Sequence, residues 1–448
     1  MWAAGLFGLC RARGRERPPG TPRRPGRAQG PRMHMESPAR KKGRQMEEKL
    51  PAGVLRILGR LQSSGHEAYV VGGCVRDALR RAAPHDWDIC TSALPQQVMA
   101  LFPRQCVRAT GLKHGTVTVL QGGQPYEVTT FRIEAAYSDG RHPDSVRFTK
   151  SLAADLARRD FTINAMAYAP GEGLIDPFGG REDLLVHRLV RAVGDPVRRF
   201  AEDGLRILRL YRFGAREQLA VEPATGRAAI AERARLDCVS AERIWQELYK
   251  LLAAPRPGSW MPPEILGQVL PWLDTAGQPA RYAASLAVVD ALPPDPLVRL
   301  AALLAPAGPG AARQAVNALR CSRAQGEEVC ALAADSALPL TGEPLRLQAR
   351  RLLARMDARR AGRLLTLRRG QTGDEGFARL AGEVRRLEQE GACCRVGQLA
   401  VNGKDLLALG VRPGPGVGRL LEAALQQVIE EKLPNQHDLL LGWLKENL

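Results

Sequence analysis

The chain has 448 residues, 45% of them hydrophobic, with 65 Lys and Arg residues against 47 Asp and Glu residues and a net charge of +18. This length predicts roughly two to four domains with sizeable cores. Arg, Glu or Pro interrupts every apolar run before the ~18 residues of a membrane span, so we expect no membrane association. The nine cysteines form no CxxC pair or zinc-spaced cluster, which suggests a reducing, cytoplasmic compartment.

Residues 1–45 are rich in Arg, Pro and Gly and lack an apolar period, which predicts a disordered basic extension. Residues 1–50 contain 13 basic and 4 acidic residues and so supply +9 of the +18 charge. The rest of the chain carries the other +9, a moderate excess that suits a polyanion such as RNA without proving one. An overextended reading frame explains the extension more simply than a transit peptide does.

The expected elements alternate at first between helix and strand. In chain order they are a helix over 47–61, a strand over 68–71, a helix over 75–81, a strand over 86–90 and a hairpin of strands over 116–120 and 126–131. After about residue 197 the pattern becomes almost wholly helical, broken by Pro and Gly clusters. The sequence therefore predicts a mixed α+β head followed by helical domains.

Three acidic residues suit a metal site. Asp86 and Asp88 are two apart on the predicted strand, so their carboxylates point to one face and can share cations of the magnesium type. Glu127 supplies a third carboxylate if its strand lies beside the first, although a solvent-facing residue is an equally good interpretation. Two such cations can activate an attacking hydroxyl and neutralise a leaving pyrophosphate.

A glycine turn precedes these acids. Gly72-Gly73, at the mouth of a helix, frees backbone N–H groups for a triphosphate, and Arg76 lies one turn further, within reach of a phosphate oxygen. A Gly-Gly turn or an Asp-x-Asp pair alone is a weak signal, since each is most often structural. Their ordered combination favours a nucleotide site.

A polar cluster follows at Arg158, Arg159, Asp160 and Asn164, expected within one or two helical turns. The arginines suit phosphate oxygens, and Asp160 and Asn164, spaced i,i+4 on one helical face, suit ribose hydroxyls. The alternative is a charged helix N-terminus. Upstream, the turn-rich segment 138–143 has the composition of a mobile loop that gates the site.

A helix is expected to begin at Glu202, with arginines at every third position, Arg206, Arg209 and Arg212. For an isolated segment, a solvated ion pair between Asp203 and Arg206 is the simpler interpretation. A carboxylate, however, only accepts hydrogen bonds and a guanidinium only donates them, so such a pair facing a Watson–Crick edge would accept cytosine and adenine and reject uracil and guanine. The protein would then act as its own template.

With these residues in order, the sequence resembles the class II tRNA nucleotidyltransferases, the CCA-adding enzymes, and the related bacterial poly(A) polymerases. The motifs that carry the resemblance are VGGCVRD, DWDICTSALP, RRDFTINAMA, DPFGGREDL, EDGLRILRLYRF and VSAERIWQEL, from about Met46 to Leu252. A weaker match returns over 399–407 and 413–418, similar to the tail of such enzymes from Gram-positive bacteria. Residues from about 255 to 396 match only as helical composition.

The resemblance implies a role for each matching residue. Asp86 and Asp88 would hold Mg²⁺, with Glu127 completing the carboxylate cluster. Asp203 and Arg206 would read the base, with Glu202 orienting Arg206. The residues that would lie at the nucleotide are Gly73, Arg76, Arg159, Asp160, Asn164, Arg209 and Arg212. One departure is Gly204 in place of a more usual Ala or Pro, which would loosen the first helical turn by roughly 1 kcal/mol.

The resemblance also implies an architecture and an activity. The expected parts are the extension 1–45, a polymerase-β-like nucleotidyltransferase head over 46–197, a helical neck over 198–255, a helical body over 256–356 and a tRNA-binding tail over 357–448. The expected reaction adds C, C and A to the 3′ end of tRNA from CTP and ATP. Poly(A) addition, split CC-only or A-only activity and a non-catalytic RNA-binding role remain alternatives, and the oligomeric state is left open.

Overall fold

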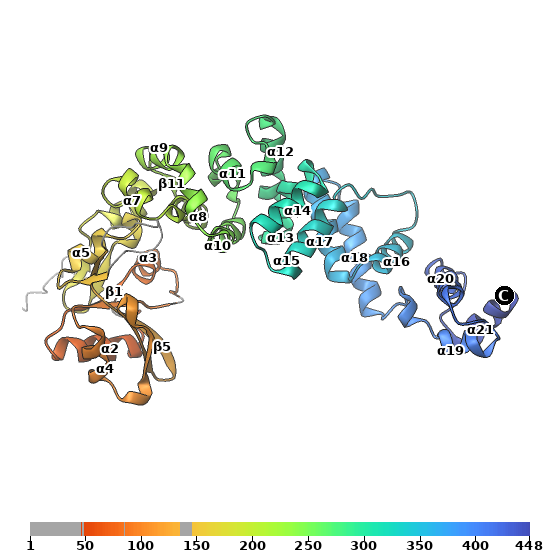
Figure 1. Cartoon of the computed structure of the whole chain (residues 1–448), viewed down its shortest axis with the longest axis horizontal. Coiled ribbons are helices and arrows are strands. Elements are labelled where there is room, and N and C mark those ends of the chain that lie inside the picture. Colours follow the sequence, from red (N-terminus) through yellow and green to blue (C-terminus); the bar gives the residue numbers. More distant parts are fainter. Residues whose placement is uncertain (1–45, 47–48, 85, 135–145) are drawn as a thin grey trace, which may run out of the picture.

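The computed structural model describes residues 46, 49–84, 86–134 and 146–448, so the predicted extension over 1–45 and the predicted gating loop over 138–143 lie outside the described residues. The molecule is elongated, with the α+β head at one end and the C-terminal helices at the other (Figure 1). This arrangement confirms the predicted fold class. None of the described helices combines the length and the apolar character needed to cross a bilayer.

The head is built on a seven-stranded mixed sheet in the order β3-β4-β5-β2-β1-β8-β9. Its strands are β1 (Ala68–Val71), β2 (Ile89–Thr91), β3 (Val107–Gly111), β4 (Thr116–Gln121), β5 (Gln124–Thr130), β8 (Ala167–Ala169) and β9 (Gly173–Ile175), and β6 (Arg132–Glu134) pairs separately with β7 (Val146–Phe148). The predicted strand at 68–71 and the predicted hairpin are confirmed. The strand predicted over 86–90 begins only at Ile89, because the chain joins the sheet where the Asp88 carbonyl accepts a hydrogen bond from the Val71 N–H (3.0 Å).

Helices support this sheet from the sides. The helices of the head are α2 (Ala52–Ser63), α3 (Gly73–Leu79), α4 (Pro95–Leu101), α5 (Leu152–Ala157) and the short α6 (Gly180–Glu182). In α2, Val54, Ile57, Leu58 and Leu61 recur at helical spacing and are buried in the core that the sheet shares. This packing holds β1 and the glycine turn that follows it in place.

The neck begins with two helices where the sequence predicted one. Its elements are α7 (Pro196–Glu202), α8 (Leu205–Glu217), α9 (Pro223–Ala231) and α10 (Ala241–Leu252), with β10 (Leu189–Val190) pairing in parallel with β11 (Ala220–Val221). The predicted helix breaks after Glu202 because Asp203 is extended (φ −150°, ψ 107°). The Asp203 carboxylate then accepts a hydrogen bond from the N–H of Leu205, the first residue of α8 (3.0 Å).

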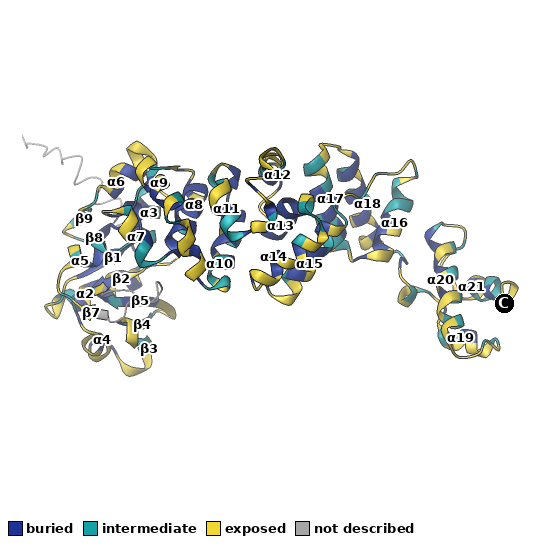
Figure 2. Cartoon of the chain, turned by 45° about the horizontal axis from the view of Figure 1, so that its top comes forward, coloured by how far each residue is buried: buried dark blue, intermediate teal, exposed yellow. Residues whose placement is uncertain are grey.

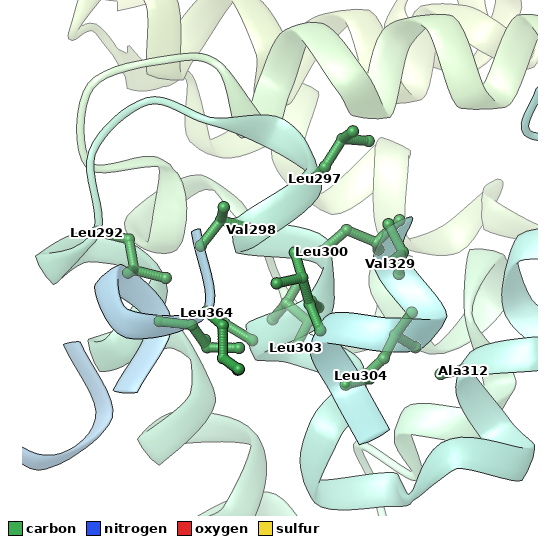
Figure 3. Packing of buried hydrophobic residues seen from close by; sticks show 14 of the residues in the cluster. Leu292, Leu297, Val298, Leu300, Leu303, Leu304, Ala312, Val329 and Leu364 are labelled. Atoms are coloured by element: carbon green, nitrogen blue, oxygen red, sulfur yellow. The ribbon is translucent and has the colours of Figure 1, made fainter. Parts of the chain in front are cut away.

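The helical region contains two hydrophobic cores. Its helices are α11 (Pro263–Val269), α12 (Pro279–Ala291), α13 (Pro296–Leu304), α14 (Pro309–Ala318), α15 (Arg323–Ala334), α16 (Leu345–Arg355), α17 (Ala358–Thr372), α18 (Gly376–Gln389), α19 (Gly403–Ala408), α20 (Pro415–Ile429) and α21 (His437–Glu446). Every residue of α13 is buried, and Figure 3 shows its leucines among Val329 of α15 and Leu364 of α17.

Buried residues form the inner faces of the helices on both sides of the change from one core to the next (Figure 2). The core around α13 continues past the predicted body end at residue 356, through α17 and α18 to Cys394. A separate core from Cys393 to Leu444 joins α19, α20 and α21. The break therefore lies near Cys393, because α17 packs against α13 and α18 packs against α16 and α17.

Candidate active site

Two neighbouring segments of the sheet bring the three predicted carboxylates together. Asp86 and Asp88 lie directly before β2, where Trp87 is buried and both acids are exposed, so the two carboxylates point to one face. β2 runs parallel to β5 with Ile89 opposite Val128, and the residues one step earlier are Asp88 and Glu127. Glu127 is also exposed. The strand that bears Glu127 therefore lies beside the one that follows Asp86 and Asp88, which is the condition for a third carboxylate at this site.

The electrostatics of this face suit a cation. Loss of hydration at its carboxyl group and then the charge of Glu127 raise the pKa of Asp88 above its ordinary value; Asp86 adds to this effect and Arg159 opposes it. No three His, Cys, Asp or Glu side chains of the described residues enclose a metal ion by themselves. A Mg²⁺ ion commonly takes only one or two carboxylates and completes its shell with phosphate oxygens and water, which fits this open pair.

The glycine turn lies beside these acids. Gly72 has φ +81°, a conformation that L side chains rarely adopt, and a Cβ added there would lie 3.0 Å from Nη1 of Arg159. Arg159 also pairs with the buried Asp155, with 3.4 Å between Nη2 and Oδ2. The turn, the arginine and the carboxylate face therefore adjoin one another, and Gly73 begins α3 at the same point.

Arg76 is turned toward protein groups. It is 3% exposed. Its Nη1 donates to Oδ1 of Asn164 (2.6 Å) and its Nε to Oδ1 of Asp77 (3.0 Å), while Glu217 lies 3.4 Å from the same Nε. The guanidinium thus anchors Asn164, a contact between residues 88 positions apart that the sequence did not reveal.

The segment that contains Asp160 and Asn164 is not the predicted α-helix. The helix α5 ends at Ala157, Phe161 forms a bridge to Ala192, and only a 3₁₀ turn spans Thr162–Asn164. The side chains nonetheless meet, because Nδ2 of Asn164 donates to Oδ1 of Asp160 (3.2 Å). The i,i+4 contact survives since a tight turn brings the two residues together as a helix would.

Asp160 joins this turn to α8. Its Oδ2 accepts hydrogen bonds from Nε (2.9 Å) and Nη2 (2.6 Å) of Arg209. Burial alone would raise the pKa of Asp160, but the charge and hydrogen bonds of Arg209, with Asn164, lower it to about 2. The carboxylate is therefore ionised throughout the physiological range, and Arg209 serves to hold it.

We expect this ion pair to stabilise the fold in a pH-dependent way. The folded pKa of about 2 lies below the ordinary value of 3.8, so the stabilisation is complete above the unfolded pKa and disappears as the pH falls toward about 2. Because the Asn variant cannot titrate here, the stability difference between wild type and Asp160→Asn should shrink by roughly 1 kcal/mol from pH 6 to pH 3. Urea unfolding of both proteins at the two pH values measures this; an equal difference at both would contradict it.

The residues predicted to read the base lie at the break between α7 and α8. Arg206 is buried, and its Nη1 donates to Oε2 of Glu202 (2.6 Å), as the predicted orienting role of Glu202 requires. Its Nη2 donates to the carbonyl of Arg158 (3.1 Å). The carboxylate of Asp203 pairs with Arg243 on α10 (2.8 Å). In place of the simple Asp203–Arg206 ion pair, the structure therefore has two pairs, Asp203 with Arg243 and Glu202 with Arg206.

The chain resembles known proteins along most of its length. Residues 68–191 match the model of the poly A polymerase head domain, and residues 300–444 match that of tRNA nucleotidyltransferase domain 2. The chain is 35% identical over 398 residues to the CCA-adding enzyme of Limosilactobacillus fermentum, which covers 86% of this chain and 94% of that protein. It is 36% identical over 401 residues to that of Geobacillus thermodenitrificans, covering 88% and 96%. The chain belongs to the CCA-adding enzymes, a family of tRNA nucleotidyltransferases.

A solved structure agrees with this family assignment. The crystal structure of the Bacillus stearothermophilus CCA-adding enzyme in complex with CTP matches with a TM-score of 0.74 at 33% identity, covering 88% of this chain and 96% of that chain. The match over 300–444 also extends the resemblance into helices that the sequence motifs left without assignment. The CCA-adding enzyme likeness thus includes the body and tail as well as the head.

A buried ion pair on the neck helices was missed by sequence reasoning. Arg212, predicted to lie at the nucleotide, is 6% exposed and hydrogen-bonds to Glu247 of α10, itself 5% exposed. The guanidinium of Arg212 also lies over the ring of Phe213, 4.0 Å from its centroid. In this member of the CCA-adding enzymes Arg212 therefore joins α8 to α10. Glu247 stands in the VSAERIWQEL motif, but its partner became visible only in the fold.

Gly204 has a packing role that its sequence position concealed. A Cβ at Gly204 would lie 2.5 Å from the carbonyl oxygen of Arg235, although its φ of −57° is open to any residue. We expect Gly204→Ala to lower the free energy of unfolding by about 1–2 kcal/mol. The backbone of residue 235 must shift to make room for the new Cβ, and the cost of this shift exceeds the gain in helix propensity from Gly to Ala. Urea denaturation tests this, and a stabilised variant would show that propensity dominates.

Proposed function

We propose that this chain adds C, C and A in turn to the 3′ end of tRNA from CTP and ATP, releasing pyrophosphate without a nucleic-acid template. The contact that carries the proposal is the hydrogen bond from Arg206 to the carbonyl of Arg158. It ties the base-reading helix α8 directly to the segment that bears Arg159 and Asp160. A nucleotide whose base faces Asp203 and Arg206 would then present its phosphates toward the carboxylate face.

We propose Asp86 and Asp88 as the ligands of Mg²⁺, with Glu127 adding negative charge beside them. When bound, such ions lower the pKa of the attacking 3′ hydroxyl and neutralise the departing pyrophosphate. The residues themselves carry exposed carboxylate oxygens on one face, the ligand type that Mg²⁺ prefers. The free cysteines of the described residues agree with the cytoplasmic setting that we propose for the enzyme.

The remaining site residues divide by what their polar atoms contact. Gly73 and Arg159 lie at the turn beside the acids and would bind the triphosphate, while Asp203 and Arg206 would read the base. The polar side-chain groups of Arg76, Asp160, Asn164, Arg209 and Arg212 are hydrogen-bonded to protein partners. We propose that these five shape the ribose and base pocket by holding the segments that line it.

Labelled-nucleotide incorporation with Mg²⁺ tests the function. Each of the four nucleoside triphosphates is offered to tRNAs that end before CCA, after C and after CC, and to an oligo(A) RNA. Addition of C, C and A that then stops is the expected result. Long A tails on any RNA would make the protein a poly(A) polymerase, and products limited to C or to A would mark a split activity. Absence of any incorporation would overturn the proposal.

A further inference from the structure

Arg243 connects the neck helix α10 to the predicted base-reading site. It lies in the first turn of α10, and its Nη2 donates to Oδ2 of Asp203 at 2.8 Å. The two side chains are 25% and 16% exposed, so the pair is largely shielded from water. Shielding strengthens a charged hydrogen bond and reduces the influence of salt on it.

The carboxylate of Asp203 is held from two directions. Oδ2 accepts from Arg243, and Oδ1 accepts from the backbone N–H of Leu205 at 3.0 Å. One partner belongs to the start of α8 and the other to α10, so together they set the plane of the carboxylate. Each oxygen keeps a further lone pair that can accept a hydrogen bond from a ligand.

The backbone at Asp203 fixes the main chain but not the side chain. The residue is extended between α7 and α8, and its carbonyl accepts a hydrogen bond from the Arg206 N–H at 3.0 Å. Arg206 is held by Glu202, with 2.6 Å between Nη1 and Oε2. The two residues that we propose as base readers are therefore positioned by different partners, Glu202 for Arg206 and Arg243 for Asp203.

Only part of the Arg243 guanidinium is hydrogen-bonded. Its Nη1 is buried without a hydrogen-bond partner among the described residues. A buried donor without a partner is destabilising. The arginine is thus poorly satisfied as a purely structural residue, while its contact with Asp203 has good geometry.

We infer that Arg243 is a positioning residue that fixes the Asp203 carboxylate for base selection, an inference that rests on the proposed function. With Arg243 in place, the carboxylate accepts only in the direction from which an exocyclic amine approaches. Without it, the carboxylate can rotate about its last side-chain torsion and accept instead from the ring N–H of uracil or guanine. Selection of C over U and of A over G then weakens.

The test compares Arg243→Met, the conservative Arg243→Lys and a matched control, Arg320→Met. Arg320 pairs with Glu242 in the same turn of α10, at 2.7 Å, and both side chains of this pair are exposed to solvent. Steady-state addition gives kcat and KM for all four nucleotides on tRNAs that end before CCA and after CC. Binding of CTP, UTP, ATP and GTP is measured by calorimetry without tRNA.

We expect Arg243→Met to lower the CTP-to-UTP and ATP-to-GTP ratios roughly 10- to 100-fold, the factor for loss of one charged hydrogen bond. Arg243→Lys should restore part of the ratio, and Arg320→Met should match wild type. An equal loss for all four nucleotides, or unchanged ratios, would overturn the inference. If wild type fails to add C, C and A, the proposed function fails, whereas the binding ratios still decide the role of Arg243.

Discussion

Replacement of Asp86 or Asp88 by Ala is expected to lower the rate of nucleotide addition by roughly 10³-fold or more, because each variant removes a proposed metal ligand worth several kcal/mol in the transition state. Both side chains are exposed, so the free energy of unfolding should change little. Single-turnover incorporation of CTP, measured against urea denaturation of the same protein, separates loss of chemistry from loss of folding.

A matched control for these variants is Glu67→Ala, which removes another exposed carboxylate of the head. It should keep the wild-type rate. A further readout is the titration of Asp88, whose pKa is raised by loss of hydration, then by the charge of Glu127 and, to a smaller extent, by that of Asp86. Asp86→Asn should lower the pKa of Asp88 toward its ordinary value. Activity that survives in either alanine variant would contradict the metal assignment.

Arg206→Ala should reduce kcat/KM for CTP and ATP by roughly 10²–10³-fold and remove most discrimination against UTP and GTP, because the only donor of the proposed Asp/Arg reading pair is lost. The variant also removes the 2.6 Å contact of Glu202 with Arg206 and leaves this carboxylate paired with Arg199 at 2.9 Å. Since the pair with Arg206 is largely buried, part of the stability should be lost as well. Incorporation of all four nucleotides measures the selectivity.

A second variant keeps that prediction testable if Arg206→Ala folds poorly. Glu202→Gln retains Arg206 and the size of its neighbour but weakens the ion pair that orients it. It should lower the CTP-to-UTP ratio by a smaller factor, about tenfold. If selectivity is intact in both variants, Arg206 does not read the base.

The local sequence pattern was sufficient to predict much of the secondary structure of the head. The strand at 68–71 and the hairpin of β4 and β5 follow from apolar spacing and from the turn at Gly122-Gly123, and the helix expected over 47–61 is present as α2, which begins at Ala52. The apolar spacing and the turn residues that mark these elements lie within each short segment, so a single sequence displays them, even though β1 pairs with the distant β8. The acids at 86 and 88 were likewise recognisable because their spacing and the glycine turn lie within one short segment.

Boundaries of elements were less predictable from pattern. The strand expected from Asp86 begins at Ile89, and the helix expected over the Asp160 segment is a 3₁₀ turn. In both places the residues have the right alternation or spacing, so their side chains still meet as expected. Neighbouring strands decide where the ladder of backbone hydrogen bonds begins and ends, and pattern alone does not contain that information.

The sequence by itself determined the fold class, the family resemblance and the residues that bear the proposed chemistry. Only the tertiary structure decided their partners: Arg76 for Asn164, Arg209 for Asp160 and Arg243 for Asp203. These contacts join residues 40 to 88 positions apart. A charged side chain can pair with any opposite charge that packing brings near it, so its partner is set by how the elements pack and not by its own neighbours in the chain.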